Sequence, residues 1–120
     1  MADTLPPTPQ DRAAIAAAVL RHYRDGGEAA WTQGRYHAAE ARDLAGAVRL
    51  ATADRVPGSV EAQDAMLIAY VRHGLDLDLD TPAKAETALV GFNDYPDRTF
   101  ADVLALCEKV ARRLEAEAQA

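Results

Sequence analysis

The chain has 120 residues and a net charge of −6, from 13 basic and 19 acidic side chains. That length accommodates one domain with a single hydrophobic core. The acidic balance argues against a general nucleic-acid binder, which needs clustered lysine and arginine. No apolar run approaches the ~20 residues that a membrane-spanning helix needs. Alanine accounts for 27 residues, which favours helices packed through small side chains.

The start of the chain has neither the basic region nor the apolar stretch of a signal peptide. We expect residues 1–7 to be a disordered lead and residues 8–117 to form a single helical domain. The single cysteine, Cys107, has no partner in the chain for a disulfide. A cytoplasmic location is therefore the simplest expectation.

The first predicted helix begins at Thr8, a favourable capping residue followed by Pro9 and Asp11. It ends near Asp25, before two consecutive glycines. Residues 28–37 lack a clear period, and we expect a short irregular connector there that places Trp31 on the core. The residues expected to face inward from this first helix are Ile15, Val19, Leu20 and Tyr23.

A second helix is predicted over residues 37–53, with Leu44, Val48 and Ala51 on one face. A loop follows, in which Ser59 is suited to cap a third helix over residues 60–73. The apolar spacing of that third helix predicts one inward face, formed by Ala62, Met66, Ala69, Tyr70 and His73.

Residues 75–80 alternate leucine and aspartate, which predicts an extended connector with its leucines facing inward. Thr81 and Pro82 begin a short helix that reaches about residue 90 or 92. Thr99 caps the closing helix, with Asp102 three residues later. The stripe of that helix is Phe100, Val103, Cys107, Val110 and Leu114, with Leu104 beside it. The prediction is a compact all-α bundle of about five helices with one irregular Trp-containing connector.

Two motifs stand out. The first is Trp31-Thr32-Gln33-Gly34 followed by Tyr36, and the second is Phe92-Asn93-Asp94-Tyr95-Pro96-Asp97-Arg98-Thr99. Together they resemble an uncharacterised family of small actinobacterial and actinophage proteins with Trp-x-Gln-Gly and Asn-Asp-x-Pro-x-Arg-Thr motifs. The chain differs from that family at Phe92, where tryptophan is usual, and at Asp43, where many relatives have cysteine. The stretch between the first motif and Asp43 is also shorter. The resemblance implies the domain bounds and the motif residues, and it implies no reaction.

The second motif has two interpretations. In the structural one, Asn93 or Asp94 forms an Asx-turn, Pro96 stiffens it, Arg98 pairs with an aspartate of the motif, and Thr99 caps the closing helix. In the functional one, the polar side chains bind a ligand, Arg98 holds an anion and an aromatic ring stacks on it. The candidate binding residues are Trp31, Gln33, Tyr36, Phe92, Asn93, Asp94 and Arg98.

No metal or other cofactor is predicted. A calcium loop beginning at Asp76 would need glycine and glutamate where the chain has Thr81 and Thr87. His37 and Glu40 occur in the reverse of the order found in ferritin-like metal sites, and only once. Cys107 lies in an apolar stripe, so we interpret it as a small buried hydrophobic residue.

These observations favour a binding or regulatory protein that contacts a protein partner or a small ligand through its motif residues. One alternative is a small acid–base enzyme with Asp94 as base, Arg98 as anion clamp and His37 nearby. Another is an acidic decoy that imitates nucleic acid. We expect no direct nucleic-acid or membrane binding, and a homodimer through the closing helix is possible because the other helices bury mostly alanine.

The negative charge is unevenly distributed. Residues 1–60 hold seven acids and seven bases, whereas residues 61–120 hold twelve acids and six bases. Residues 76–97 alone hold six acids against a single lysine. We therefore expect an acidic edge that leads into the second motif, where a basic partner or a cation would bind.

Overall fold

The computed structural model describes residues 6–35, 37–58 and 60–120, and only the backbone of residue 37. The predicted roles of Tyr36 and Ser59 therefore lie outside the described residues, as do the first five residues of the expected lead. Within the described ranges the chain is an all-α single-domain bundle. Its helices are α1 (Pro9–Gly26), α2 (Leu44–Arg55), α3 (Val60–Leu75), α4 (Pro82–Asp94) and α5 (Phe100–Gln119). A 3₁₀-helix, Gly27–Ala30, extends α1.

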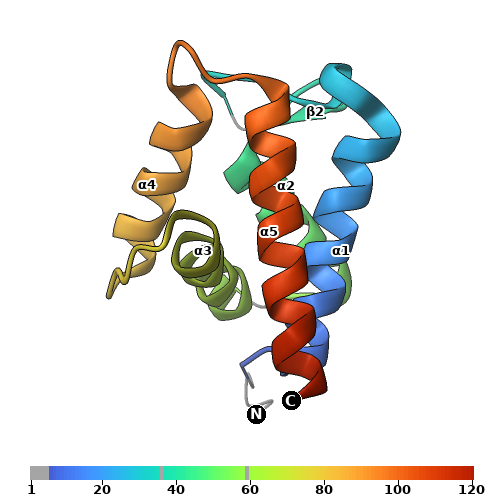
Figure 1. Cartoon of the computed structure of the whole chain (residues 1–120), viewed down its shortest axis with the longest axis vertical. Helices are drawn as coiled ribbons and strands as arrows, with labels where there is room; N and C mark the ends of the chain where they lie inside the picture. The colour runs from blue at the N-terminus through green and yellow to red at the C-terminus, as the bar shows by residue number, and fades with distance from the viewer. Residues whose placement is uncertain (1–5, 36, 59) are drawn as a thin grey trace.

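The longest helices, α1 and α5, lie side by side and run in opposite directions (Figure 1). Helix α3 contacts α2, α4 and α5. At one end of the molecule, the turn between α4 and α5 lies close to the segment that joins α1 to α2. Residues far apart in the sequence therefore meet at that end.

Helices α1, α4 and α5 begin where their capping residues predict. The Thr8 hydroxyl accepts a 3.0 Å hydrogen bond from the Asp11 backbone, and the Asp11 carboxylate accepts one of 3.2 Å in return. Thr99 and Asp102 form the same reciprocal pair at the start of α5. Thr81 caps α4 through the backbone N–H of residue 84. Each cap pairs N–H groups that have no partner within the helix.

The prediction of a helix from residue 37 was wrong. Residues 37–42 form a short antiparallel ladder of β1 (His37–Ala38) and β2 (Ala41–Arg42) instead. Helix α2 begins only at Leu44, because the Asp43 carboxylate accepts a hydrogen bond from the backbone of Gly46 and caps the helix there. The ladder closes through Ala39, whose φ of 55° is left-handed.

The core contains most of the residues predicted to face inward, but on α3 Ala69 and His73 are only partly buried, whereas Leu67 and Val71 are fully buried. The four inward residues predicted for α1 are all buried, and so are Val103, Cys107, Val110 and Leu114 of α5. Leu106 joins them, although it was not predicted to do so. In the extended connector after α3, Leu77 is 45% exposed and does not face inward. The apolar stripe of α5 is thus packed inside the chain's own core, so a second copy would have to use another face of this helix.

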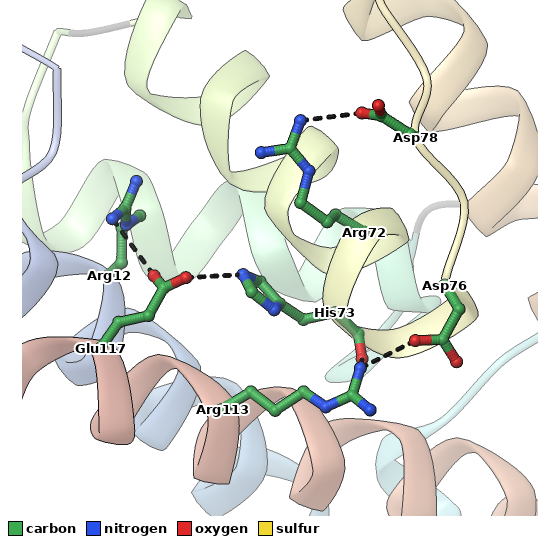
Figure 2. A network of polar contacts seen from close by, with 7 residues as sticks. All are labelled: Arg12, Arg72, His73, Asp76, Asp78, Arg113 and Glu117. Atoms are coloured by element: carbon green, nitrogen blue, oxygen red, sulfur yellow. Dashed lines mark hydrogen bonds and ion pairs between the residues drawn. The ribbon is translucent and has the colours of Figure 1, made fainter.

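A polar network joins the end of α3 to the two long helices (Figure 2). Glu117 lies 3.3 Å from Arg12 on α1 and, through its other oxygen, 3.2 Å from His73 on α3. Arg113 donates 2.8 Å hydrogen bonds to the His73 carbonyl and to Asp76. Cations at the C-terminal end of a helix stabilise its unpaired carbonyls. The network therefore fixes where α3 ends against α5.

Most of the acidic edge is neutralised within the chain. Four of the six acids between residues 76 and 97 form ion pairs: Asp76 with Lys109 and Arg113, Asp78 with Arg72, Asp80 with Lys84, and Glu86 with Arg49. This leaves less uncompensated charge for a basic partner than the sequence alone indicates. None of the helices in the described part of the chain has the length and apolar character needed to cross a bilayer.

Candidate functional site

The two sequence motifs meet at the side chain of Asn93, in the last turn of α4. Asn93 is fully buried, and its Oδ1 accepts hydrogen bonds from the Trp31 indole at 2.7 Å and from the Leu44 backbone at 3.0 Å. Its Nδ2 donates to the Thr32 carbonyl at 3.0 Å and to the Asp94 carboxylate at 2.9 Å. A carboxamide has two acceptor positions and two donors. All four are used, so Asn93 has no capacity left for a ligand.

The Asn93 side chain holds both ends of the segment formed by residues 31–44. Trp31 and Leu44 bracket the segment that contains β1 and β2, and the same amide group binds to both of them. The backbone N–H of Thr32 also donates to the carbonyl of Arg42 over 3.2 Å, and this hydrogen bond joins the two ends of the segment directly. The role of Asn93 in this structure is therefore to join the first motif to α4.

Gln33 and Gly34 attach the first motif to the turn after α4. The Gln33 Nε2 donates to the carbonyls of Asn93 at 2.9 Å and Tyr95 at 3.1 Å. The backbone N–H of Gly34 donates to the Asp94 carboxylate at 2.9 Å. Both hydrogens of the Gln33 amide are thus committed, while its Oε1 has no hydrogen-bond partner among the described residues.

Arg98 does not pair with an aspartate of its own motif, which corrects the structural interpretation of the sequence. Its Nε donates a 2.7 Å hydrogen bond to the Phe92 carbonyl, and its guanidinium carbon lies 3.8 Å from the centroid of the Phe92 ring. The Tyr95 ring lies 5.3 Å away. The nearest carboxylate is that of Asp102, 3.9 Å from Nη1. The guanidinium is therefore held by its Nε edge and one face, whereas its terminal nitrogens form only this long ion pair.

Part of each motif lines one open hollow of about 550 Å³. It brings Trp31, Gln33 and Arg98 together, while Asn93 and Asp94 are not part of its lining. The sequence did not identify the remaining lining residues as part of a site. Thr99 and Phe100 were predicted to be a helix cap and a core residue, and Glu28 and Thr32 had no pattern that indicates binding. The full lining is Glu28, Trp31, Thr32, Gln33, Arg98, Thr99 and Phe100.

Asp43 is the one acidic side chain of the described residues that is buried. Burial raises the pKa of its carboxyl to about 6, partly offset by the hydrogen bond from Gly46 and reinforced by the charges of Asp94 and Glu86. A carboxyl with such a pKa is a feature of some catalytic sites. Here its Oδ1 caps α2 over 2.6 Å, and Asp43 is not among the residues that line the hollow.

Other chemically capable groups lie elsewhere. Within the described ranges, no three histidine, cysteine or acidic side chains are grouped closely enough to bind a metal ion. Burial raises the pKa of Cys107 to about 12, so the thiol is inert at neutral pH. A separate depression of about 680 Å³ lies between α1 and β2 and gathers no motif residue. Its histidine, His22, is bound to the Ala30 carbonyl over 3.1 Å.

Fold and site together define a small all-α protein whose two polar motifs are joined by one buried asparagine. The chain belongs to a family of unknown function, DUF6197, whose model matches residues 4–113. No curated protein and no solved structure significantly matches the chain.

Proposed function

We propose that this chain is a binding or regulatory protein that contacts a small ligand or a protein partner through the hollow beside Trp31 and Arg98. The proposal also places it in the cytoplasm, because its single cysteine is a buried thiol suited to a reducing compartment. An origin in actinobacteria or their phages stays a prediction from the motif resemblance.

One observation carries the proposal: two motifs about 60 residues apart present a single surface. Asn93 is used entirely inside the protein, which leaves Trp31, Gln33 and Arg98 to line the hollow. A concave site with an aromatic wall and a few fixed polar groups is the usual form of a ligand-binding site. The terminal nitrogens of Arg98 remain able to donate to a bound molecule, since their ion pair with Asp102 is long.

Protein NMR tests this proposal directly. The Trp31 indole N–H and the Arg98 Nε–H give their own signals in a proton–nitrogen spectrum of the labelled protein. Small aromatic amides, acids and amines would be added to about 10 mM, the range expected for fragment-sized ligands. We expect saturable shifts of both signals with at least one compound. If no compound shifts them more than it shifts the exposed Arg112 signal on α5, the proposal is wrong.

A matched pair of variants supplies the control. Arg98→Lys keeps the charge and removes the planar fork and the contact with Phe92. Arg112→Lys makes the same chemical change at an exposed position on α5. We expect the ligand-induced shift of the Trp31 indole signal to disappear in Arg98→Lys and to persist in Arg112→Lys. An equal response of the two variants would place binding elsewhere on the molecule.

The alternative functions receive less support from this geometry. The acid–base enzyme requires Asp94 in the pocket, but its carboxylate accepts hydrogen bonds from Gly34 and Asn93 and it does not line the hollow. The acidic decoy requires rows of free acids, and most of the acids between residues 76 and 97 are ion-paired. A homodimer through α5 likewise stays an untested prediction.

A further inference from the structure

The hollow contains one fixed hydrogen-bond donor. The Nε of Arg98 is bound to the Phe92 carbonyl at 2.7 Å and its guanidinium stacks on the Phe92 ring, so the group has little freedom to turn. The side chain keeps 24% of its accessible surface. Its terminal N–H groups are therefore oriented in advance toward an acceptor.

The hollow also contains one fixed acceptor. The Gln33 Nε2 gives both of its hydrogens to main-chain carbonyls, at 2.9 and 3.1 Å. These two partners can only accept, so they determine which end of the amide is nitrogen. The Oε1 of Gln33 is consequently left to accept a hydrogen bond from outside the protein.

The remaining lining disfavours charged ligands. Glu28 lines the same hollow, and the carboxylate of Asp102 lies 3.9 Å from Arg98. These acids repel an anion, whereas Arg98 repels a cation. The rings of Trp31 and Phe100, with centroids 6.4 Å apart, offer an apolar surface beside the polar groups.

We infer that the hollow recognises an uncharged amide group carried next to an apolar side chain, as in the main chain of a partner peptide. This inference rests on the proposed function and adds the chemical class of the ligand. The amide carbonyl accepts from Arg98, and the amide N–H donates to Gln33. A carboxylate has no hydrogen for Gln33, and an ammonium group has no acceptor for Arg98, so each would leave one protein group unpaired.

Three probes with the same aromatic body separate these possibilities: phenylacetamide, phenylacetate and phenethylamine. Their dissociation constants would be measured from the Trp31 and Arg98 signals of the full chain at pH 7. We expect phenylacetamide to bind about 5-fold more tightly than either charged probe. If a charged probe binds equally well or better, the inference is wrong and the proposed function stands. If none binds, both are wrong.

Two variants probe the polar groups separately. Gln33→Ala should reduce the preference for phenylacetamide about 5-fold, whereas Gln119→Ala on exposed α5 should leave it unchanged. Glu28→Gln removes a charge from an exposed position. It tests the effect of that charge separately from the hydrogen bond of Gln33. It should strengthen binding of phenylacetate and leave that of phenylacetamide unchanged. If it affects the two probes equally, the acids do not set the ligand class.

A peptide source is distinguished from a small amide by a fourth probe. N-acetyl-phenylalanine N-methylamide has the same aromatic body and two amide groups in the arrangement of a peptide main chain. We expect it to bind about 5-fold more tightly than phenylacetamide, because it forms further hydrogen bonds of the same kind. If it binds no more tightly, a small carboxamide is the ligand and the peptide assignment is wrong.

Discussion

The indole N–H of Trp31 donates a 2.7 Å hydrogen bond to the side-chain oxygen of Asn93, which lies 62 residues further along the chain. This contact converts two separate sequence motifs into one structural unit. Because Asn93 also accepts from Leu44, the same amide group determines where the chain leaves the bundle and where it returns. Trp31, Gln33 and Arg98 keep accessible surface and line the hollow.

Replacing Asn93 with alanine should destabilise the protein strongly. The change leaves the Trp31 indole and the Leu44 N–H without their acceptor, in a place from which water is excluded. Each buried group without a partner costs about 1–3 kcal/mol, so we expect a loss of about 2 kcal/mol or more. Urea unfolding followed by Trp31 fluorescence measures it. Gln119→Ala, at an exposed site, should stay within about 0.5 kcal/mol. Similar values for the two variants would contradict the role given to Asn93.

Two glycines should respond in opposite ways to alanine. A Cβ at Gly74 would lie 3.0 Å from Leu106 and 3.1 Å from Val110, where α3 packs against α5. A Cβ at Gly91 on α4 would meet no atom within 4 Å. We expect Gly74→Ala to lose about 1–2 kcal/mol through overpacking, and Gly91→Ala to gain about 0.5–1 kcal/mol through helix propensity. Thermal unfolding of both variants tests this, and a stabilised Gly74→Ala would show that α3 and α5 pack less closely there.

Two buried tyrosines should differ in what their hydroxyl groups contribute. The hydroxyl of Tyr23 donates a 3.0 Å hydrogen bond to the Arg42 carbonyl, whereas that of Tyr70 is buried without a partner among the described residues. Tyr23→Phe should therefore cost about 1 kcal/mol, and Tyr70→Phe should be neutral or stabilising. Chemical denaturation of the two variants under the same conditions gives the comparison. A larger loss for Tyr70→Phe would reveal a partner for its hydroxyl.

The buried carboxyl of Asp43 should make stability depend on pH. Its pKa rises from 3.8 to about 6 in the folded protein, mainly through burial. The folded state thus holds this proton more tightly, and the stability it contributes is lost as the pH rises through about 6. Asp43→Asn keeps an oxygen to cap α2 at Gly46. We expect its melting temperature to exceed that of the wild type by about 5 °C at pH 8 and to match it near pH 4. A difference that does not change with pH would contradict this.

The parts of the fold that sequence predicts are those set by local chemistry. Thr8, Thr81 and Thr99 cap helices because a hydroxyl beside a helix start pairs its free N–H groups, and the pattern lies within a few residues. The inward stripe of the closing helix follows from its period in the same way. Both depend only on neighbours in the sequence, so the bundle and most of its core could be predicted.

The site depends on contacts that no local pattern contains. The ladder of residues 37–42 looks helical in sequence, and it turns through Ala39 in a left-handed conformation that alanine rarely adopts. Asp43 does carry a signal, since an aspartate just before an apolar helical stretch is a common cap. The motif residues were named from the sequence, but their division into buried Asn93 and accessible Arg98 required the approach of segments about 60 residues apart.

The contact between the start of α1 and the end of α5 has a practical consequence. Gln10 donates to the Ala118 carbonyl over 3.3 Å, and α5 then runs 20 residues, about 30 Å, back to the hollow at its start. Figure 1 shows α5 running along the long axis, with its last turn beside the start of α1. A surface or a fused protein attached before Gln10 or after Ala118 would therefore lie at the end of the molecule away from the hollow. The hollow would stay open to solution in an immobilised sample, so sensor-chip measurements of its ligands are feasible from either attachment point.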